Sequence, residues 1–96
     1  MKKSNIIGEN IKSIRQRAGL TQAQFAESLK KSQSAIYSYE CGAILPGFDV
    51  LVRISQIYGV SIGQIMGIEW HPVSIDALRR VYAIYLEEVE KDEQKE

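Results

Sequence analysis

Residues 19–42 read GLTQAQFAESLKKSQSAIYSYECG and contain the signals for two short helices joined by a tight turn. Thr21 and Gln24 have the capping-box spacing, in which the threonine hydroxyl accepts from the Gln24 amide and the glutamine side chain bonds back. Ser32 is a good N-cap for the next helix, and Gly42 signals its end. The stretch therefore predicts one helix from after Thr21 to near Lys30, and another from after Ser32 to before Gly42.

The inner and outer faces of this helix pair differ in character. Two helices that cross at a tight turn need a small residue where their backbones approach and apolar anchors facing inward. Ala26 supplies the small residue, while Ile36 and Tyr39 supply the anchors. The side chains on the polar outer face are short enough for the helix to lie deep in a DNA major groove. A helical hairpin that merely packs against a core would show the same pattern. The outer-face residues are Gln33, Ser34, Tyr37 and Ser38.

Helical spacing continues on both sides of the pair, and no strand pattern occurs. Apolar residues recur every three or four positions over about 7–18, 46–58, 62–66 and 75–89, which predicts four further helices. Ser4 or Asn5 is expected to cap the first, Pro46 to open the fourth, and Ser61 and Ser74 to cap the fifth and sixth. We expect an all-α chain. The residues predicted to face inward in the helix after Pro46 are Leu51, Ile54, Ile57 and Tyr58.

Length and composition limit the possible classes of protein. Ninety-six residues suffice for one small domain with an appendage and are too few for a large multi-layer enzyme. Hydrophobic residues at 45% and charged residues at 25% are typical of soluble globular chains. The single cysteine, Cys41, excludes an internal disulfide and a cysteine zinc cluster, which favours a reducing, cytoplasmic setting. No apolar run is long enough to span a bilayer, so no membrane association is expected.

The formal net charge of zero is the sum of two unlike parts. Residues 1–66 carry a net charge of +4, and residues 67–96 carry −4. This asymmetry is consistent with a front that faces a polyanion and a back that stays away from it. A solvated acidic helix end would give the same count.

Marker residues then occur in a familiar order: Gly19-Leu20-Thr21-Gln22, Phe25-Ala26, Ile36, Tyr39-Glu40, Gly42, Pro46, Leu51 and Gly59-Val60-Ser61. With them the sequence resembles the lambdoid-repressor-like, or XRE (Cro-C1 type), family of helix-turn-helix DNA-binding domains over roughly residues 6–66. The resemblance implies a compact five-helix domain within residues 1–66 whose third helix reads the major groove of double-stranded DNA.

The resemblance also implies roles for individual residues. Gln33 is expected to pair with adenine, because a glutamine amide can bond to adenine N6 and N7 together. Arg15 and Glu40 match positions that form a largely buried structural ion pair in some relatives. The base-contacting residues would be Gln33, Ser34, Tyr37 and Ser38, and the backbone-contacting residues would be Thr21, Gln22, Lys31 and Ser32.

The sequence departs from the family pattern at two places. Lys30 stands where glycine is common, so a lysine is expected in the left-handed conformation that ends the helix. Lys31 replaces a usually apolar residue, and the loop 43–45 lacks the basic residues that relatives often point at phosphate. The turn is therefore expected to differ locally, and affinity for the DNA backbone to be modest.

Residues 67–73 are predicted to be a linker and residues 74–96 an appended C-terminal helix. The apolar stripe of this helix has coiled-coil spacing over about two heptads, which favours pairing across a twofold axis. The alternative is that the helix folds back on its own domain. The candidate dimerisation residues are Ile75, Leu78, Tyr82, Tyr85 and Val89.

These features favour a sequence-specific DNA-binding transcriptional regulator, expected to be a repressor that binds a palindromic operator as a homodimer. The alternative hypothesis is a protein-interaction module, such as an antitoxin or a regulator controlled by a protein partner at its C-terminal helix. No catalytic constellation, cofactor motif or metal-ligand set occurs, so we expect no enzyme, cofactor or metal. Cys41 is expected to be a buried or half-buried spectator, His71 to lack co-ligands, and Trp70 to plug the joint before the last helix.

Overall fold

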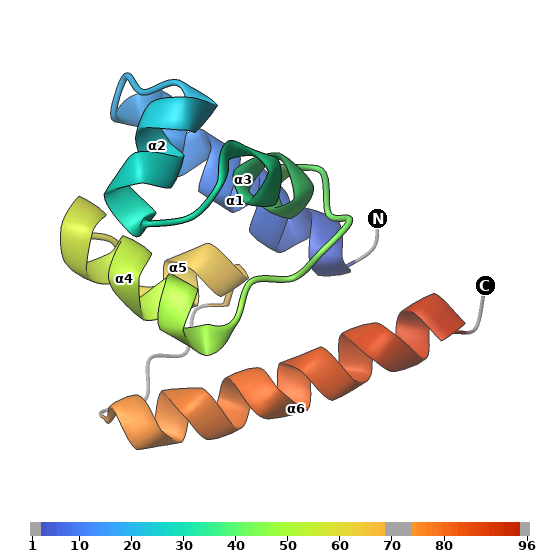
Figure 1. Ribbon diagram of the computed structural model, residues 1–96. Helices are drawn as coiled ribbons and strands as arrows, with labels where there is room; N and C mark the ends of the chain where they lie inside the picture. Colours follow the sequence, from blue (N-terminus) through green and yellow to red (C-terminus); the bar gives the residue numbers. More distant parts are fainter. Residues whose placement is uncertain (1–2, 69–73, 95–96) are drawn as a thin grey trace.

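The computed structural model describes residues 3–68 and 74–94, which contain six α-helices and no strand. Five helices form a compact body, and the sixth lies along one side of it (Figure 1). The predicted all-α class is confirmed. The helices are α1 (Lys3–Arg17), α2 (Gln22–Leu29), α3 (Gln33–Glu40), α4 (Phe48–Tyr58), α5 (Ile62–Met66) and α6 (Ile75–Gln94).

Local signals determine the ends of α2 and α3. The Thr21 hydroxyl accepts from the Gln24 amide at 3.2 Å, and the Gln24 side chain accepts from the Thr21 amide at 2.9 Å, which completes the predicted capping box. The Ser32 hydroxyl accepts from the Ala35 amide at 3.0 Å and caps α3. Lys30 ends α2 in the left-handed conformation, with φ 56° and ψ 42°. A non-glycine residue tolerates this conformation at some energetic cost.

Three expectations about the other helices are wrong. The first helix already begins at Lys3, so Ser4 and Asn5 lie inside it rather than capping it. The fourth begins at Phe48 with Gly47 as its N-cap, so Pro46 lies in the preceding loop. Ile57 faces outward and is 48% exposed, whereas Leu51 and Ile54 are buried as predicted. Ser61 and Ser74 do cap the helices that follow them.

The core joins the buried faces of all the helices, with Phe25, Ile36 and Leu51 fully enclosed. α3 packs against both α1 and α2. Gly8 in α1 makes this approach possible, because a Cβ atom there would lie 2.8 Å from the Glu40 carbonyl oxygen and would also clash with that of Tyr39. The end of α3 is therefore held directly against the backbone of α1.

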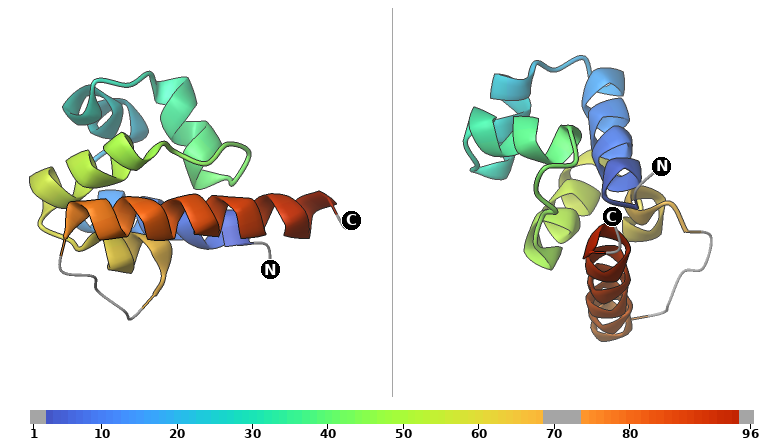
Figure 2. Two further views of the ribbon diagram at one scale, coloured as in Figure 1. Left: turned by 90° about the horizontal axis from the view of Figure 1, so that it is seen from below. Right: turned by 90° about the vertical axis from the view of Figure 1, so that its right-hand side faces the viewer.

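The last helix docks on its own domain. Tyr82 is only 1% exposed, and its hydroxyl donates to the Pro46 carbonyl oxygen at 2.6 Å. Val89 is also buried, and the Arg79 guanidinium lies 4.9 Å from the centre of the Phe48 ring. Figure 2 shows α6 crossing one face of the body, with its C-terminal end extending past the other helices. The fold-back alternative thus describes the isolated chain.

The docking of α6 on its own domain limits which of the five candidate dimerisation residues can contact a second copy. Tyr82 and Val89 lie in the chain's own interior, and Leu78 and Tyr85 are half-buried beside them. Ile75 alone among the five candidates is well exposed, at 52%. A second copy cannot use the whole stripe while α6 is docked. The predicted linker residue Trp70, together with His71, lies outside the described residues.

Burial of Tyr82 has an electrostatic consequence. Removal from water disfavours the phenolate, so the pKa of the Tyr82 hydroxyl is raised well above its ordinary value, with smaller contributions from Tyr85 and Tyr39. Burial similarly raises the pKa of Tyr39 and of Tyr85. The neutral hydroxyl of Tyr82 is the form that donates to Pro46, so loss of its proton would remove this hydrogen bond between α6 and the body.

Candidate nucleic-acid interface

The outer face of α3 is open to solvent. Gln33 and Ser34 in its first turn are exposed, Tyr37 is 61% exposed, and Ser38 is half-buried. The opposite face is buried, which leaves the outer side chains to project from a rigid support. α6 lies away from α3 in both Figure 1 and Figure 2, so the described part of the C-terminal helix does not cover this surface. Three of the four predicted base-contacting residues are thus exposed on the same helix.

Polar groups also gather where α2 and α3 begin. Thr21, Lys31 and Ser32 are exposed. The two hydroxyl oxygens accept backbone amides as N-caps, and each hydroxyl keeps its hydrogen for donation to an external acceptor. Backbone N–H groups and the positive end of the helix dipole at these termini also favour an anion. The arrangement can bind phosphate oxygens without contacting any base.

Gln22 is positioned by a charged network beneath it. Arg15 donates from Nε to Glu40 Oε2 at 2.6 Å and from Nη2 to Glu40 Oε1 at 3.1 Å, a two-bond pair. The Gln22 amide donates to the same Glu40 Oε1 at 3.1 Å, and Arg15 also donates to the Leu20 carbonyl oxygen at 2.9 Å. The carboxylate therefore joins α1, the start of α2 and the end of α3.

The ion pair is nearly removed from solvent. The Glu40 side chain is 5% exposed and that of Arg15 is 12% exposed. The hydrogen bond to Glu40 raises the pKa of the Arg15 guanidinium, so this group stays charged at any accessible pH. A buried two-bond pair constrains geometry strongly, because loss of either partner leaves an uncompensated charge.

A shallow hollow of about 220 Å³ lies next to the network, with Lys12, Tyr37 and Cys41 on its walls. The expectation of a buried or half-buried thiol is wrong, since Cys41 is exposed. Its Sγ lies 3.6 Å from the Ser38 carbonyl oxygen, as expected for a residue that ends a helix. Lys12 was not singled out from the sequence, because its position on the α3 side of α1 depends on how the helices cross.

Two further polar contacts hold the helix pair in place. Arg53 of α4 donates to the Leu29 carbonyl oxygen at 2.7 Å and satisfies an end of α2. Asn10 of α1 donates to the carbonyl oxygens of Gln64 and Ile65, at 3.2 and 3.0 Å. Both contacts join residues at least 24 positions apart along the chain, so helical spacing could not reveal them.

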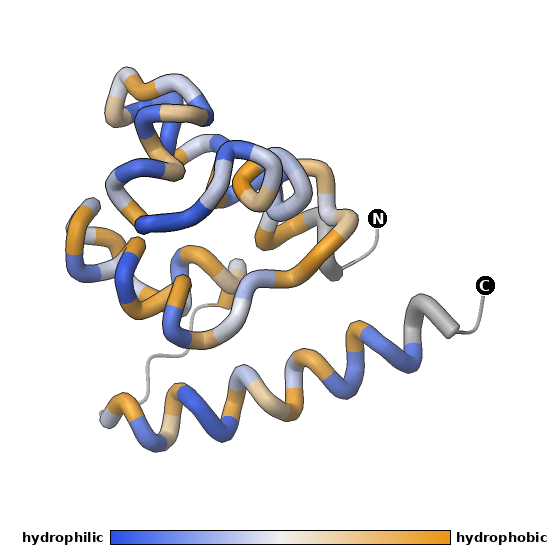
Figure 3. Tube along the Cα trace, viewed as in Figure 1, coloured by the Kyte–Doolittle hydropathy of each residue, from blue (hydrophilic) through white to orange (hydrophobic). Residues whose placement is uncertain are grey.

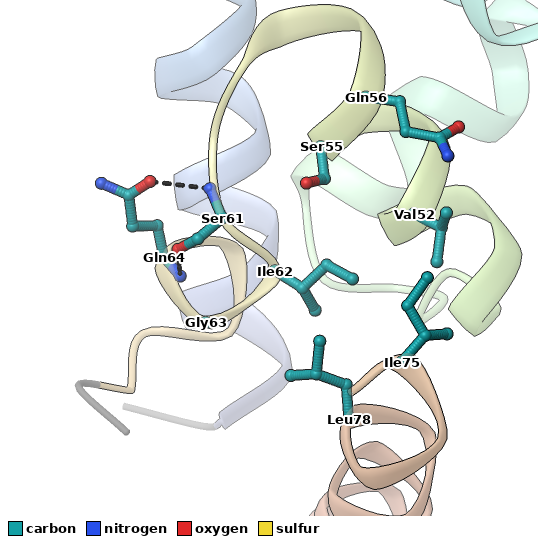
Figure 4. Close-up of a pocket in the computed structure, with 9 residues that line it drawn as sticks. All are labelled: Val52, Ser55, Gln56, Ser61, Ile62, Gly63, Gln64, Ile75 and Leu78. Carbon is teal, nitrogen blue, oxygen red and sulfur yellow. Dashed lines mark hydrogen bonds between the residues drawn. The ribbon is translucent and has the colours of Figure 1, made fainter. Parts of the chain in front are cut away.

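A larger pocket of about 540 Å³ lies elsewhere, between α4, α5 and the start of α6. Ile62, Ile75 and Leu78 form much of its apolar wall, and the Ser61–Gln64 capping box lies at its rim (Figure 4). No cluster of charged or nucleophilic side chains converges on it. Within residues 3–68 and 74–94, no group of His, Cys, Asp or Glu could hold a metal ion. None of the helices described there is long and apolar enough to cross a membrane.

Comparison with known proteins agrees with this geometry. A helix-turn-helix family model matches residues 11–65, which include α2 and α3. The HTH-type transcriptional regulator ImmR of Bacillus subtilis (strain 168) is 34% identical over 61 residues, which are 64% of this chain and 48% of ImmR. YqaE of the same strain, described as an uncharacterized HTH-type transcriptional regulator, is 33% identical over 61 residues, 64% of this chain and 53% of YqaE. The chain thus matches about half the length of these relatives.

Proposed function

The chain belongs to the helix-turn-helix family of the XRE (Cro-C1) type, and from that premise we propose that it is a sequence-specific DNA-binding transcriptional regulator. The observation that carries the proposal is the exposed polar face of α3 above a buried apolar face. Gln33, in the first turn of α3, is the main specificity residue in this proposal, because its amide can pair with both N6 and N7 of adenine. Ser34, Tyr37 and Ser38 flank it.

Backbone contacts come from the start of the two helices in this proposal. Thr21, Lys31 and Ser32 bind phosphate from one side, and Gln22 binds it while its orientation is held by Glu40. Such contacts set the register of the protein on the duplex and carry no sequence information by themselves. The charge asymmetry supports the same orientation, since residues 1–66 are net basic and residues 67–96 net acidic.

The proposed regulator is a repressor that binds a palindromic operator as a homodimer. A single short recognition helix contacts only a few base pairs, which is too little information to specify one site in a genome. Two copies related by a twofold axis double the number of contacts and demand a symmetric site, with half-sites roughly one helical turn apart. Bound across a promoter, such a dimer blocks it without any cofactor.

The test is a selection from random duplex DNA followed by titration of the selected site at several salt concentrations. Phosphate contacts release counterions, so the observed affinity should fall steeply as salt rises. A symmetric selected site supports a dimeric regulator, and an asymmetric site restricts the proposal to a monomeric reader. A flat selection with no salt dependence rejects DNA recognition and favours a protein-interaction module.

A further inference from the structure

The outward face of α6 carries an ordered pattern of charges. Two residues along a helix turn the side-chain direction by about 200°, so Ile84 lies opposite the buried Tyr82. Ile84 is 56% exposed. The same outward stripe, followed along the helix, reads Asp76, Arg80, Ile84, Glu87 and Lys91, all of them exposed. The pattern is therefore negative, positive, apolar, negative, positive, and we call it the α6 outer stripe.

Two copies of this charge pattern place opposite charges against each other only when the two helices run antiparallel. In a parallel pair, each charge would face its own equal on the second copy. In an antiparallel pair centred between Ala83 and Ile84, Arg80 faces the partner's Glu87 and Asp76 faces the partner's Lys91. Each contact occurs twice across the twofold axis, which gives four opposite-charge pairs around a small apolar centre. The charges thus select one orientation and one register.

The charged side chains of the stripe form no ion pairs with one another among the described residues. Asp76 and Arg80 are four residues apart, as are Glu87 and Lys91, and such spacing allows intrahelical pairs. Neither pair is an ion pair among the described residues. Figure 2, in its left view from below, shows no described helix between α6 and the viewer, and Figure 3 shows apolar positions alternating with polar ones along α6.

We infer that the α6 outer stripe is a docking surface for a second copy of this chain, with the two α6 helices antiparallel. The inference rests on the homodimer in the proposed function and replaces the inward stripe with the outward one. Because α6 keeps Tyr82 docked, each copy stays folded as it is in isolation. The apolar centre is small, so the dimer is weak, with a dissociation constant in the micromolar to millimolar range. Two adjacent DNA half-sites strengthen it by raising the effective concentration.

The experiment measures self-association of the full chain without DNA by sedimentation equilibrium. Arg80→Glu places like charges against the partner's Glu87 at both symmetric contacts, and Glu87→Arg places like charges against the partner's Arg80. Each single variant is expected to weaken the dimer about tenfold or more. An equimolar mixture of the two variants restores opposite charges at both contacts, so it is expected to form a heterodimer at least as tight as the wild-type dimer.

Matched controls carry the same charge changes outside the stripe. Lys12→Glu and Glu9→Lys lie on exposed positions of α1 and are expected to leave self-association unchanged. Melting curves of every variant check that the fold is retained. A wild-type chain that stays monomeric at millimolar concentration overturns the inference, and so does a dimer that the single reversals leave intact or that mixing does not restore.

The outcomes also separate this inference from the proposed function. If the chain is monomeric but still selects a DNA sequence, the α6 dimer is rejected and the proposed DNA recognition stands. If the chain dimerises as described but selects no DNA sequence, the docking surface is supported and the proposed regulator is rejected.

Discussion

The α2–α3 pair and α6 are held to the body by different kinds of interaction. α3 is positioned by a buried ion pair and its hydrogen bonds, from Arg15 through Glu40 to Gln22. α6 is positioned mainly by the burial of Tyr82 and Val89, together with the hydrogen bond from Tyr82 to Pro46. Apolar burial is tolerant of small shifts, whereas a two-bond ion pair has strict geometry. We infer that the contacts of α3 chiefly fix its orientation, whereas those of α6 chiefly cover apolar surface of the body.

Tyr82→Ala is expected to have the largest effect on stability, because it removes a fully buried aromatic ring and leaves a cavity. The free energy of unfolding should fall by about 4 kcal/mol. Affinity of the folded protein for a single DNA half-site should stay unchanged, since α3 lies away from α6. Urea denaturation and DNA titration measure the two effects, with Ile57→Ala in α4, an exposed position outside the α6 outer stripe, as the control. Loss of half-site affinity in fully folded Tyr82→Ala protein would contradict the separation of the two regions.

Glu40→Ala is expected to affect stability and DNA binding together. It leaves Arg15 without its partner in a nearly closed site, at a cost of about 3 kcal/mol, and it releases Gln22. Thermal melting and DNA titration are the measurements. A variant that melts normally but fails to bind would show that Glu40 acts on DNA directly and not through the position of α3.

Gln33→Ala is expected to change DNA binding alone. Removing the proposed bidentate base contact should lower affinity for the selected site about tenfold or more, while the exposed position leaves the melting temperature unchanged. Titration of duplexes with each base substituted in turn locates the contact. Equal loss of affinity on every duplex would mean that Gln33 contacts phosphate instead.

Alkaline pH should weaken the packing of α6 through Tyr82. The pKa of Tyr82 is higher in the folded chain than its ordinary value of 10.0 in an unfolded one. The stabilisation is therefore complete below about pH 10 and is lost as pH rises above it. Tyr82→Phe should lower the free energy of unfolding by about 1 kcal/mol at neutral pH and make its decline above pH 10 shallower. Denaturation from pH 7 to 11 measures both, and an equally steep alkaline decline in the variant would assign it to other groups.

Lys30→Gly should have the smallest effect, and it should be stabilising. Glycine removes the cost of the left-handed backbone, and its greater freedom in the unfolded chain offsets part of that gain. A net increase of about 0.5 kcal/mol is expected. Unchanged DNA affinity at low salt would show that the Lys30 charge takes no part in binding, and a decrease would place it near phosphate.

Much of the body could be predicted because its signals are local. Thr21 and Gln24 are three residues apart, and Ser32 caps the helix that begins next to it. The boundaries of α2 and α3 are therefore determined by residues close together in the sequence. The left-handed Lys30 followed from a single unusual residue at a position where glycine is common. The accessible face of α3 follows in turn from these boundaries and from the burial of Ile36 and Tyr39.

Features that depend on how helices cross could not be predicted in this way. The closeness of Gly8 to the end of α3, the bonds from Asn10 and the Tyr82–Pro46 contact all join distant parts of the sequence. The apolar spacing on α6 is equally suited to a partner helix and to the chain's own body. Only the position of the Pro46 carbonyl and the Phe48 ring decides between them.

The contact between Tyr82 and Pro46 also bears on how the chain folds during synthesis. Tyr82 is made 36 residues after the carbonyl that it binds. The first five helices can assemble as they leave the ribosome, since domains fold from the N-terminus as the chain emerges. Until α6 follows, one apolar flank of that early body remains open to water and to other nascent chains. α6 is therefore expected to act as a late cover for the apolar surface that Tyr82 and Val89 bury.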